Sequence, residues 1–292
     1  MLTLSRRRLL TALALTPLMQ VAPLRAAVPD PSRILAMEWL PVELLMALGV
    51  APLGVADTRN YRIWVGDPVL PASTVDLGLR TEPNLELMTQ LHPSLILHSN
   101  GYGPSLDKLD RIAPSMGFDL NSGDGKPLTT ARKSLQALGA RLGREAQAQQ
   151  HLYEMDAQLA VARERLKPFA SRPLLLMSLL DSRHAITFGA NSLFLEVMQT
   201  LGLRNAWQGE TNFWGSAVVG LERLADVGDV QVICFDHDNA RDMQQVQATA
   251  LWQALPFVRA GRFQRVPAVW YYGATYSTLK FVRVLTDALE SS

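Results

Sequence analysis

The sequence predicts an α/β fold of two similar Rossmann-like lobes joined by a single long α-helix. Three observations carry this prediction. Apolar, strand-like runs alternate with helix-like segments, which indicates parallel sheets with helices on both faces. The same short succession of elements occurs once in each half of the chain. Between the halves, residues 144–167 form an uninterrupted stretch of helix-favouring residues.

The first element that we expect is an export signal over residues 1–26. Arg6, Arg7 and Arg8 precede a modest apolar run, and small residues surround the expected cleavage after Ala26. The run is too short to cross a bilayer. Paired arginines before such a run indicate the twin-arginine route, so we expect the protein in the periplasm. An ordinary secretory signal or a buried first helix are the alternatives.

Removal of this segment changes the charge of the chain. Residues 1–26 hold four arginines and no acidic residue, so 28 Lys+Arg become 28 − 4 = 24 against 27 Asp+Glu, a net charge of about −3. This balance argues against nucleic acid or an anionic membrane as a partner. Cys234 is the single cysteine, which excludes an internal disulfide. It lies in an apolar run, so we interpret it as a core residue of a strand.

The first lobe is expected over residues 27–143 and the second over 168–292. Each begins with a strand and a helix, over 33–37 and 43–50 in the first lobe and over 185–188 and 196–203 in the second. Both helices end in Leu-Gly followed by an aliphatic residue, where glycine serves as the C-cap. The similarity indicates two lobes of one design.

A second similarity follows in the same order. A short helix with a Leu-Glu pair precedes a buried strand, over 84–88 and 95–97 in the first lobe and over 220–224 and 232–235 in the second. Between the lobes, the expected helix 144–167 contains no glycine or proline and carries apolar residues at spacings of three and four. It would span about 36 Å at about 1.5 Å per residue. Its central position favours a rigid connection between the lobes over a surface helix of one domain.

Signatures of catalysis are scarce. The chain has no dinucleotide fingerprint, phosphate-binding lysine loop or nucleophile elbow, and its five histidines share no ligand spacing. The best polar cluster is Asp236, His237 and Asp238, directly after a predicted strand. It would suit an exported metal-dependent hydrolase only if other strands supplied further ligands.

Aromatic residues give a stronger signal. Segments 61–64, 100–103, 212–216 and 270–273 all carry them, and we expect each to be a loop after a strand. Loops lie on the surface, and aromatic-lined clefts with few polar groups are typical of ligand pockets. Arg80, expected in a turn, could direct forked hydrogen bonds to oxygen ligands. A surface salt bridge to Glu82 is the alternative.

Over nearly its whole length the chain resembles the periplasmic ferric-hydroxamate (ferrichrome) binding proteins of iron-siderophore ABC importers. The stretches that carry the resemblance are EWLPVELL (38–45), GLRTEPNLEL (78–87), GYGPS (101–105), NAWQGETNFWGS (205–216) and VRAGRFQRVPAVW (258–270). The resemblance implies two lobes on one long helix, with the ligand in a shallow cleft between them. It implies a monomer without catalysis, with an inner-membrane ABC permease and its ATPase as partners. No cofactor is expected, because iron arrives already ligated by the siderophore.

The resemblance also implies roles for particular residues. Arg80 and Tyr102 would donate hydrogen bonds to the hydroxamate oxygens. The pocket would be lined or flanked by Trp64, Trp214, Trp270, Tyr272, Ile186, Asn212 and Ser216. His98 replaces an aromatic residue of the close family, which is expected to alter ligand preference or introduce pH dependence.

Glu86 and Glu222 occupy matching places in the two lobes. The resemblance matches them to acidic residues that dock onto permease arginines, and solvation of a helix surface is the alternative. The same architecture with another bulky ligand, such as a catecholate siderophore, haem or cobalamin, also remains open. Catecholate complexes are strongly anionic and would need several arginines, whereas only Arg80 is evident in the expected cleft loops.

Overall fold

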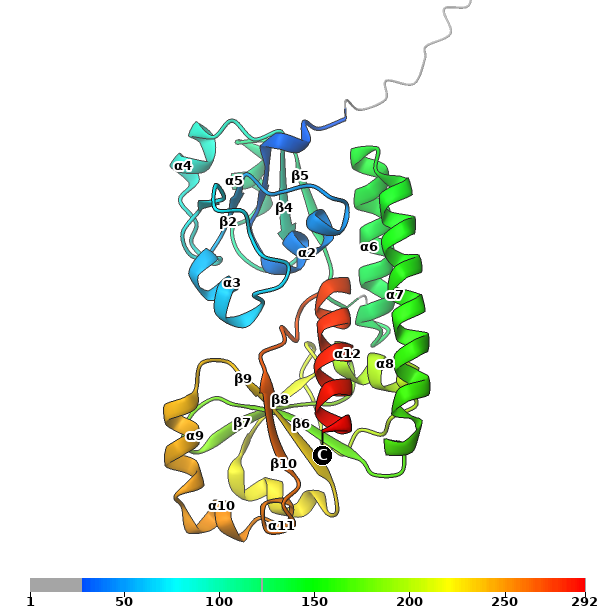
Figure 1. The fold of residues 1–292 in the computed structure, drawn as a ribbon. Helices are drawn as coiled ribbons and strands as arrows, with labels where there is room; N and C mark the ends of the chain where they lie inside the picture. The colour runs from blue at the N-terminus through cyan, green and yellow to red at the C-terminus, as the bar shows by residue number, and fades with distance from the viewer. Residues whose placement is uncertain (1–27, 122, 292) are drawn as a thin grey trace, which may run out of the picture.

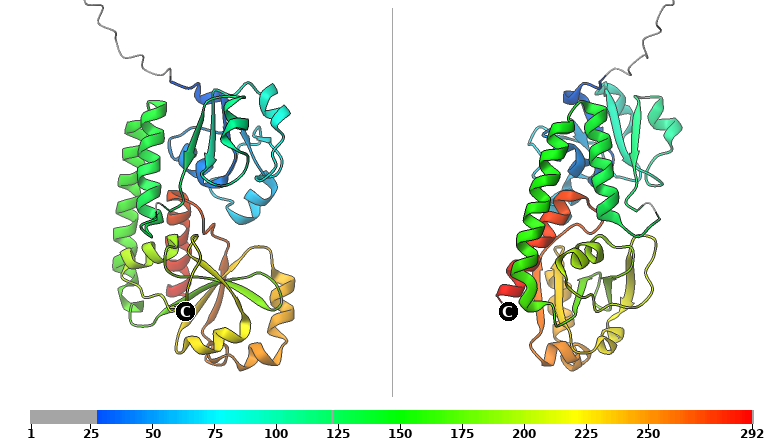
Figure 2. Two further views of the ribbon diagram at one scale, coloured as in Figure 1. Left: turned by 180° about the vertical axis from the view of Figure 1, so that it is seen from behind. Right: turned by 90° about the vertical axis from the view of Figure 1, so that its right-hand side faces the viewer.

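The computed structural model describes residues 28–121 and 123–291, so the predicted export signal lies outside the described residues. Two α/β lobes lie one above the other, and long helices run along one side of both (Figure 1). Two further views show the same arrangement (Figure 2). Among the described helices, none is both long and apolar enough to cross a membrane.

The first lobe contains a wholly parallel five-stranded sheet in the order β3-β2-β1-β4-β5. The chain moves outward from β1 to β3 on one side and then returns to β4 on the other. Its elements are η2 (Pro31–Arg33), β1 (Ile34–Ala36), α2 (Trp39–Ala47), β2 (Gly54–Val55), α3 (Thr58–Trp64), β3 (Val75–Asp76), α4 (Leu85–Gln90), β4 (Leu95–Ser99), α5 (Leu106–Asp110) and β5 (Ser115–Phe118). The strand order therefore reverses between β1 and β4, which is the point where open α/β sheets hold their ligands.

The second lobe contains a five-stranded sheet in the order β10-β9-β6-β7-β8. Its elements are β6 (Leu174–Leu179), β7 (His184–Phe188), α8 (Leu193–Leu201), β8 (Ser216–Gly220), η4 (Leu221–Val227), β9 (Gln231–Asp236), α9 (Ala240–Gln247), α10 (Ala250–Ala254), α11 (Pro256–Arg259), β10 (Phe263–Pro267) and α12 (Thr275–Glu290). The free Cys234 is buried in β9, as expected for a core residue.

The prediction of a parallel sheet is wrong for half of the second lobe. Strands β6, β7 and β8 pair antiparallel, and only β6, β9 and β10 are parallel. The connection from β6 to β7 is a tight turn, in which the Asp181 carboxylate accepts backbone hydrogen bonds from Arg183 and His184 at 2.7 and 2.8 Å. A parallel pair needs a crossover of a dozen or more residues, so a turn of this length imposes an antiparallel hairpin.

The predicted similarity between the lobes is confirmed at the helix ends. Gly49 after α2 and Gly202 after α8 have φ of 71° and 75°. In each lobe the next amide donates to the carbonyl five residues earlier, Val50 to Leu45 at 3.3 Å and Leu203 to Met198 at 2.9 Å. Both helices thus end in the same glycine-dependent motif. The two predicted Leu-Glu helices are also present, as α4 and as the 3-10 helix η4.

The long helix predicted over 144–167 is α7 (Glu145–Leu166), and its apolar stripe is buried. It does not stand alone. Helix α6 (Pro127–Leu142) lies beside it, and α12 packs along it from the other end of the chain (Figure 1). Helix α7 passes into the short η3 (Lys167–Phe169). One apolar core runs beneath both lobes and includes Leu44 of α2, Phe194 of α8 and Phe281 of α12. The lobes are therefore joined by a shared core as well as by α7.

A buried carboxyl group also links the lobes. Glu43 of α2 is fully buried and accepts backbone hydrogen bonds from Ala274 at 2.9 Å and Ser277 at 2.8 Å, at the start of α12. Its other oxygen accepts from the Ser277 hydroxyl. A carboxylate in this position satisfies amides that a helix N-terminus leaves unpaired. The last helix of the chain is thus capped by a side chain from the first lobe.

Candidate ligand-binding cleft

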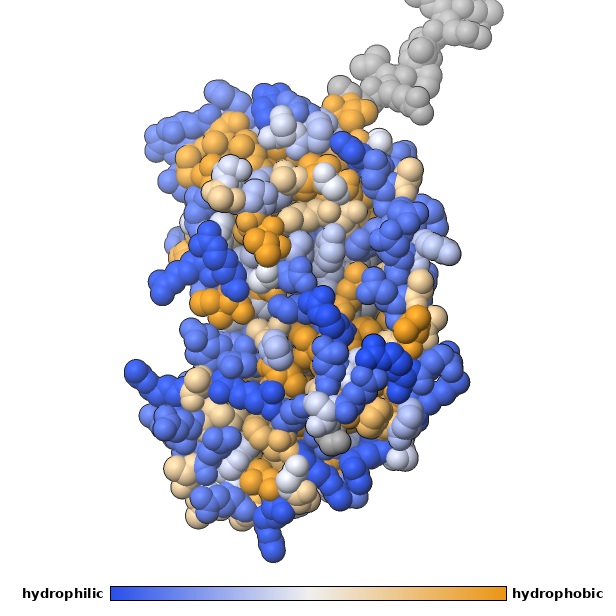
Figure 3. Space-filling view, viewed as in Figure 1, coloured by the Kyte–Doolittle hydropathy of each residue, from blue (hydrophilic) through white to orange (hydrophobic). Residues whose placement is uncertain are grey.

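A cavity of about 280 Å³ lies between the lobes, near the lower limit of the volumes typical of small-molecule sites. Both lobes contribute to it. The lining residues are Glu38, Leu40, Arg80, Ser99, Tyr102 and Leu120 from the first lobe, and Trp214, Trp270 and Tyr272 from the second. The face of the molecule drawn in Figure 3 is largely hydrophilic, with smaller hydrophobic areas between.

The first-lobe wall of the cavity is built at the reversal of strand order. Glu38 follows the carboxyl end of β1, and Ser99 ends the neighbouring β4. Tyr102 comes from the loop after β4, where Gly103 has φ of 84° and a Cβ there would lie 3.1 Å from the Arg80 carbonyl oxygen. Only glycine suits this left-handed, close approach. It brings the Tyr102 loop against the segment that carries Arg80.

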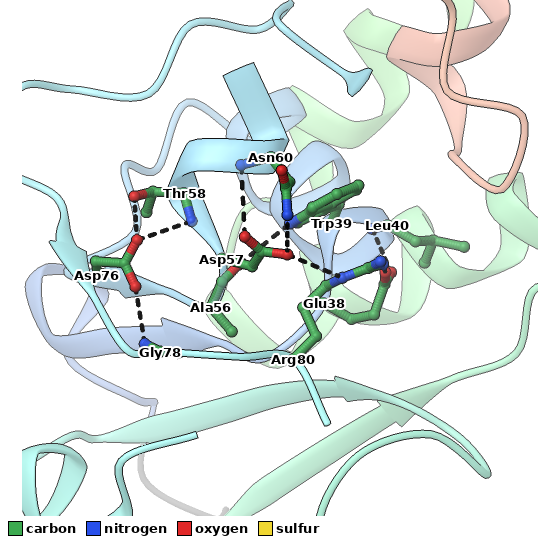
Figure 4. Close-up of polar contacts among 10 residues, drawn as sticks. All are labelled: Glu38, Trp39, Leu40, Ala56, Asp57, Thr58, Asn60, Asp76, Gly78 and Arg80. Carbon is green, nitrogen blue, oxygen red and sulfur yellow. Dashed lines mark hydrogen bonds and ion pairs between the residues drawn. The ribbon is translucent and has the colours of Figure 1, made fainter. Parts of the chain in front are cut away.

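Arg80 is the central polar group of this wall. Its Nη1 pairs with Glu38 Oε1, and its Nε lies 4.0 Å from the Asp57 carboxylate (Figure 4). The guanidinium carbon lies 3.8 Å from the centroid of the Trp39 ring, in cation–π geometry. It also lies 5.6 Å from the Tyr102 ring centroid. Arg80 therefore does form a salt bridge, but its partner is Glu38 at the cavity and not Glu82.

The second-lobe wall is aromatic. Trp270 and Tyr272 meet edge to face with their centroids 5.3 Å apart, and Trp214 lies 5.7 Å from Tyr272. The Tyr272 hydroxyl is 2.9 Å from Ser216 Oγ, and burial raises the pKa of this phenol. Asn212 does not line the cavity. It stabilises the loop that carries Trp214, because its Oδ1 accepts from the Trp214 amide at 2.9 Å and the Ser216 amide at 3.1 Å.

Five of the residues expected at the pocket do not line the cavity, namely Asn212, Ser216, Trp64, Ile186 and His98. Trp64 lies at the end of α3, not in a loop, and its ring stacks on His237 with centroids 4.3 Å apart. Ile186 is buried in β7. His98 is 5% exposed, and because alternate strand residues face opposite ways, the adjacent Ser99 takes the cavity position. Burial lowers the pKa of His98, so its ring is neutral at neutral pH.

The sequence analysis missed Glu38, although it begins the stretch EWLPVELL. Its position directly after β1 was the available signal, because the carboxyl ends of parallel strands are where such sheets place polar ligand contacts. Glu38 is the N-cap of α2, because its Oε2 accepts from the Leu40 amide at 3.0 Å. It performs this role and also pairs with Arg80.

The hydrolase alternative finds no support in the described residues. Asp236 pairs with Arg265 at 2.6 Å. Both ring nitrogens of His237 have neighbours, Ser178 Oγ at 2.8 Å and the Val269 carbonyl at 3.3 Å, and burial lowers its pKa to about 4. Over 28–121 and 123–291, no group of three or more histidine, cysteine or acidic residues could hold a metal ion.

These features define a class of protein. Two α/β lobes enclose an aromatic cavity with one arginine and two phenols, as in a two-lobed ligand-binding protein. A family model described as periplasmic binding protein matches residues 34–269. The chain therefore belongs to the periplasmic binding protein family.

Individual relatives agree with this assignment. The chain is 57% identical over 288 residues to the Iron(3+)-hydroxamate-binding protein FhuD of Escherichia coli strain K12, covering 98% of this chain and 97% of the relative. The crystal structure of the siderophore-binding protein FhuD from Vibrio cholerae, bound to Fe³⁺-Desferal, matches with a TM-score of 0.82 at 30% identity, covering 90% of this chain and 98% of that one. FhuD2 of Staphylococcus aureus with bound ferrioxamine B matches at 0.69 and 19% identity, over 87% and 96% of the two chains, which shows the shared fold.

Proposed function

We propose that the protein binds iron(III)-hydroxamate siderophores of the ferrichrome type in the cleft between its lobes. It then delivers them to an inner-membrane ABC permease with its ATPase, without catalysing a reaction. The observation that carries the proposal is the pairing of Arg80 and Tyr102 on one wall with three aromatic rings on the other. The 57% identity to a hydroxamate-binding relative supports it.

The chemistry of the ligand suits these walls. A ferric tris-hydroxamate is electrically neutral, and its iron is already fully ligated, so the protein needs no metal ligand or cofactor of its own. Arginine carries five N–H donors, and the pairing of one nitrogen with Glu38 leaves others for hydroxamate oxygens. Tyr102 is partly exposed at the cavity and offers a hydroxyl. The aromatic wall formed by Trp214, Trp270 and Tyr272 suits the apolar arms.

Fluorescence tests this proposal. Trp214 and Trp270 line the cavity, so ferrichrome should quench their emission in a saturable way. Iron-free ferrichrome and a ferric salt with a weak chelator are the controls. Saturable quenching by iron-loaded ferrichrome, and by neither control, supports the proposal. The absence of a saturable response to any ferric hydroxamate contradicts it. A panel of ferrichrome, coprogen, aerobactin and ferrioxamine would rank the ligands.

The export route is a separate proposal. We propose that residues 1–26 direct the protein to the periplasm by the twin-arginine pathway, because the signal carries Arg6, Arg7 and Arg8 before its apolar run. Replacement of all three by lysine keeps the positive charge that a secretory signal needs but removes the guanidinium groups. Precursor should then accumulate in the cytoplasm, and normal export of this variant would indicate the secretory route.

Docking to the permease is proposed through one acidic residue on each lobe. Glu86 in α4 and Glu222 in η4 are both exposed. Exposed charges mainly set the rate and orientation of association, so reversal of both should abolish siderophore-dependent growth and leave ligand binding unchanged. Each single reversal should have a milder effect. Transport by the double variant, or loss of its ligand binding, would refute the docking assignment.

A further inference from the structure

Glu38 uses both carboxylate oxygens, each for a different purpose. Oε2 caps helix α2 through the Leu40 amide at 3.0 Å, and Oε1 pairs with Arg80 (Figure 4). The residue is 7% exposed, yet it lines the cavity. A buried carboxylate is tolerated only when it is paired, and Arg80 and the N-terminus of α2 are the partners of Glu38 in this position.

The pair determines the charge that the cavity presents. Among the nine lining residues, Glu38 and Arg80 are the charged ones, so their charges sum to zero. A second carboxylate, Asp57, does not line the cavity; its Oδ2 lies 4.0 Å from Arg80 Nε, farther than the Glu38 oxygen, and also accepts from Asn60 Nδ2 at 3.0 Å at the N-terminus of α3. The positive charge of Arg80 is thus cancelled inside the site.

The pair also fixes the guanidinium in space. The Trp39 ring, with its centroid 3.8 Å from the guanidinium carbon, restrains one side of the group, and the Glu38 ion pair restrains Nη1. The remaining N–H groups are therefore oriented before a ligand arrives, which reduces the entropy lost on binding. Without Glu38, Arg80 would keep the Trp39 contact and the longer 4.0 Å contact with Asp57, but it would lose its close partner and the only negative charge among the nine lining residues.

We propose that Glu38 is a specificity-determining residue, which holds Arg80 as an oriented donor while cancelling its charge. The cleft would then select ferric complexes by shape and hydrogen bonding, and its affinity for them would depend little on their net charge. This inference rests on the proposed function, because it concerns the ligands of the same cavity.

Three ligands built on one scaffold test it. Ferrioxamine B carries one free ammonium group, its N-acetyl derivative is neutral, and its N-succinyl derivative carries one carboxylate. Affinities should vary little across this series for the wild type. For Glu38→Gln, affinity should rise from the cationic to the anionic ligand, because unit charges roughly 10 Å apart change an affinity by roughly two- to fifteenfold in media between protein and water. We expect a spread of about tenfold or more across the series.

Salt separates a charge effect from a structural one. Near 1 M salt the screening length falls to about 3 Å, so the spread in Glu38→Gln should collapse there. Glu38→Asp keeps the charge and a good N-cap and should restore the flat response. Glu82→Gln, an exposed change in the Arg80 turn, should behave as the wild type.

The outcomes distinguish this inference from the proposed function. Wild-type binding of the series with no more than a twofold spread in Glu38→Gln overturns the role of Glu38 and leaves the proposed function intact. A salt-insensitive spread also overturns it. Failure of the wild type to bind any member refutes the proposed function itself. A thermal melt of each variant confirms that a folded protein is compared.

Discussion

The two walls of the cleft differ in how their side chains are held. On the first lobe, polar groups are fixed by charge, with Arg80 between Glu38 and the Trp39 ring. On the second lobe, aromatic rings are held by packing. The centroid of the Trp270 ring lies 4.8 Å from that of Trp39 and 5.3 Å from that of Tyr272. One lobe design has thus been adapted twice, once to supply directional hydrogen bonds and once to supply apolar area.

The difference predicts how the walls respond to mutation. Loss of a packed ring removes contacts that also support the core, so it should affect folding and binding together. Loss of Arg80 should weaken binding directly, because its side chain lines the cavity, and its cost to folding comes from leaving the buried Glu38 without its partner.

The largest effect is expected for Trp270→Ala. Trp270 is buried against rings of both lobes, and truncation of such a side chain costs about 3–5 kcal/mol of unfolding free energy. Trp214 is only half-buried, so Trp214→Ala should weaken ligand binding with a smaller loss of stability. Urea unfolding measures both, and equal losses for the two variants would contradict the assignment of Trp270 to the shared core.

The second-largest effect concerns the stability that depends on Glu43, the buried carboxyl group that links the two lobes. Burial raises the pKa of Glu43 from 4.5 to about 7, so the folded state binds the proton more tightly than the unfolded chain. This contribution to stability is complete below pH 4.5 and is lost as pH rises towards 7. The loss is about 3–4 kcal/mol at most, at about 1.4 kcal/mol per unit of pKa.

Glu43→Gln isolates this contribution. The amide oxygen can accept the two backbone hydrogen bonds, and the amide nitrogen can donate to the Ser277 hydroxyl, so the variant should fold. Its unfolding free energy, measured by denaturant from pH 5 to 8, should lack the decline that the wild type shows. Parallel pH curves for the two proteins would exclude Glu43 as the titrating group.

A smaller effect is expected on the polar wall. Arg80→Ala should weaken ferric-hydroxamate binding by about 1.5–3 kcal/mol, the range for hydrogen bonds to a charged group. Tyr102→Phe removes one hydroxyl and should cost less. Calorimetric titration with ferrichrome measures both, and unchanged affinity in both variants would remove these residues from the site.

The smallest effect on affinity is expected for the hydrogen bond that holds Tyr272 in the aromatic wall. Ser216→Ala removes the 2.9 Å contact with the Tyr272 hydroxyl and should reduce affinity by about 0.5–1.5 kcal/mol, the net value of a single hydrogen bond. Ser105→Ala, an exposed change at the start of α5 that makes no side-chain cap, is the control. An effect no larger than that of the control would show that packing alone orients Tyr272.

The architecture was predictable because it rests on local patterns. The apolar stripe of α7 and the glycine-terminated helices α2 and α8 follow from spacing and from backbone conformations that glycine favours. Strand β7 was predicted over 185–188, but its antiparallel pairing with β6 and β8 was missed because an apolar run carries no sign of its direction. Only the short turn at Asp181 indicates it.

The site was less predictable because its contacts join distant parts of the chain. Arg80, Tyr102, Trp270 and Tyr272 do reach one cavity. Trp64 does not line it, because its helix turns the ring onto His237, a residue of the other lobe. The partner of Arg80 was also hidden, since Glu38 lies 42 positions away in the sequence and is brought near only by the parallel pairing of the sheet.

The shared core has a consequence for the timing of synthesis and export. Phe281 and Leu285 of α12 belong to the core that includes α2 of the first lobe, and Glu43 lacks its partners until Ala274 and Ser277 have been made. Domains generally fold from the N-terminus as the ribosome releases them. Here the core that the lobes share is complete only when α12 has been made, at the end of translation. Under the proposed twin-arginine route, we therefore expect passage across the membrane only after synthesis has ended, and shortening of the chain before α12 should retain it in the cytoplasm.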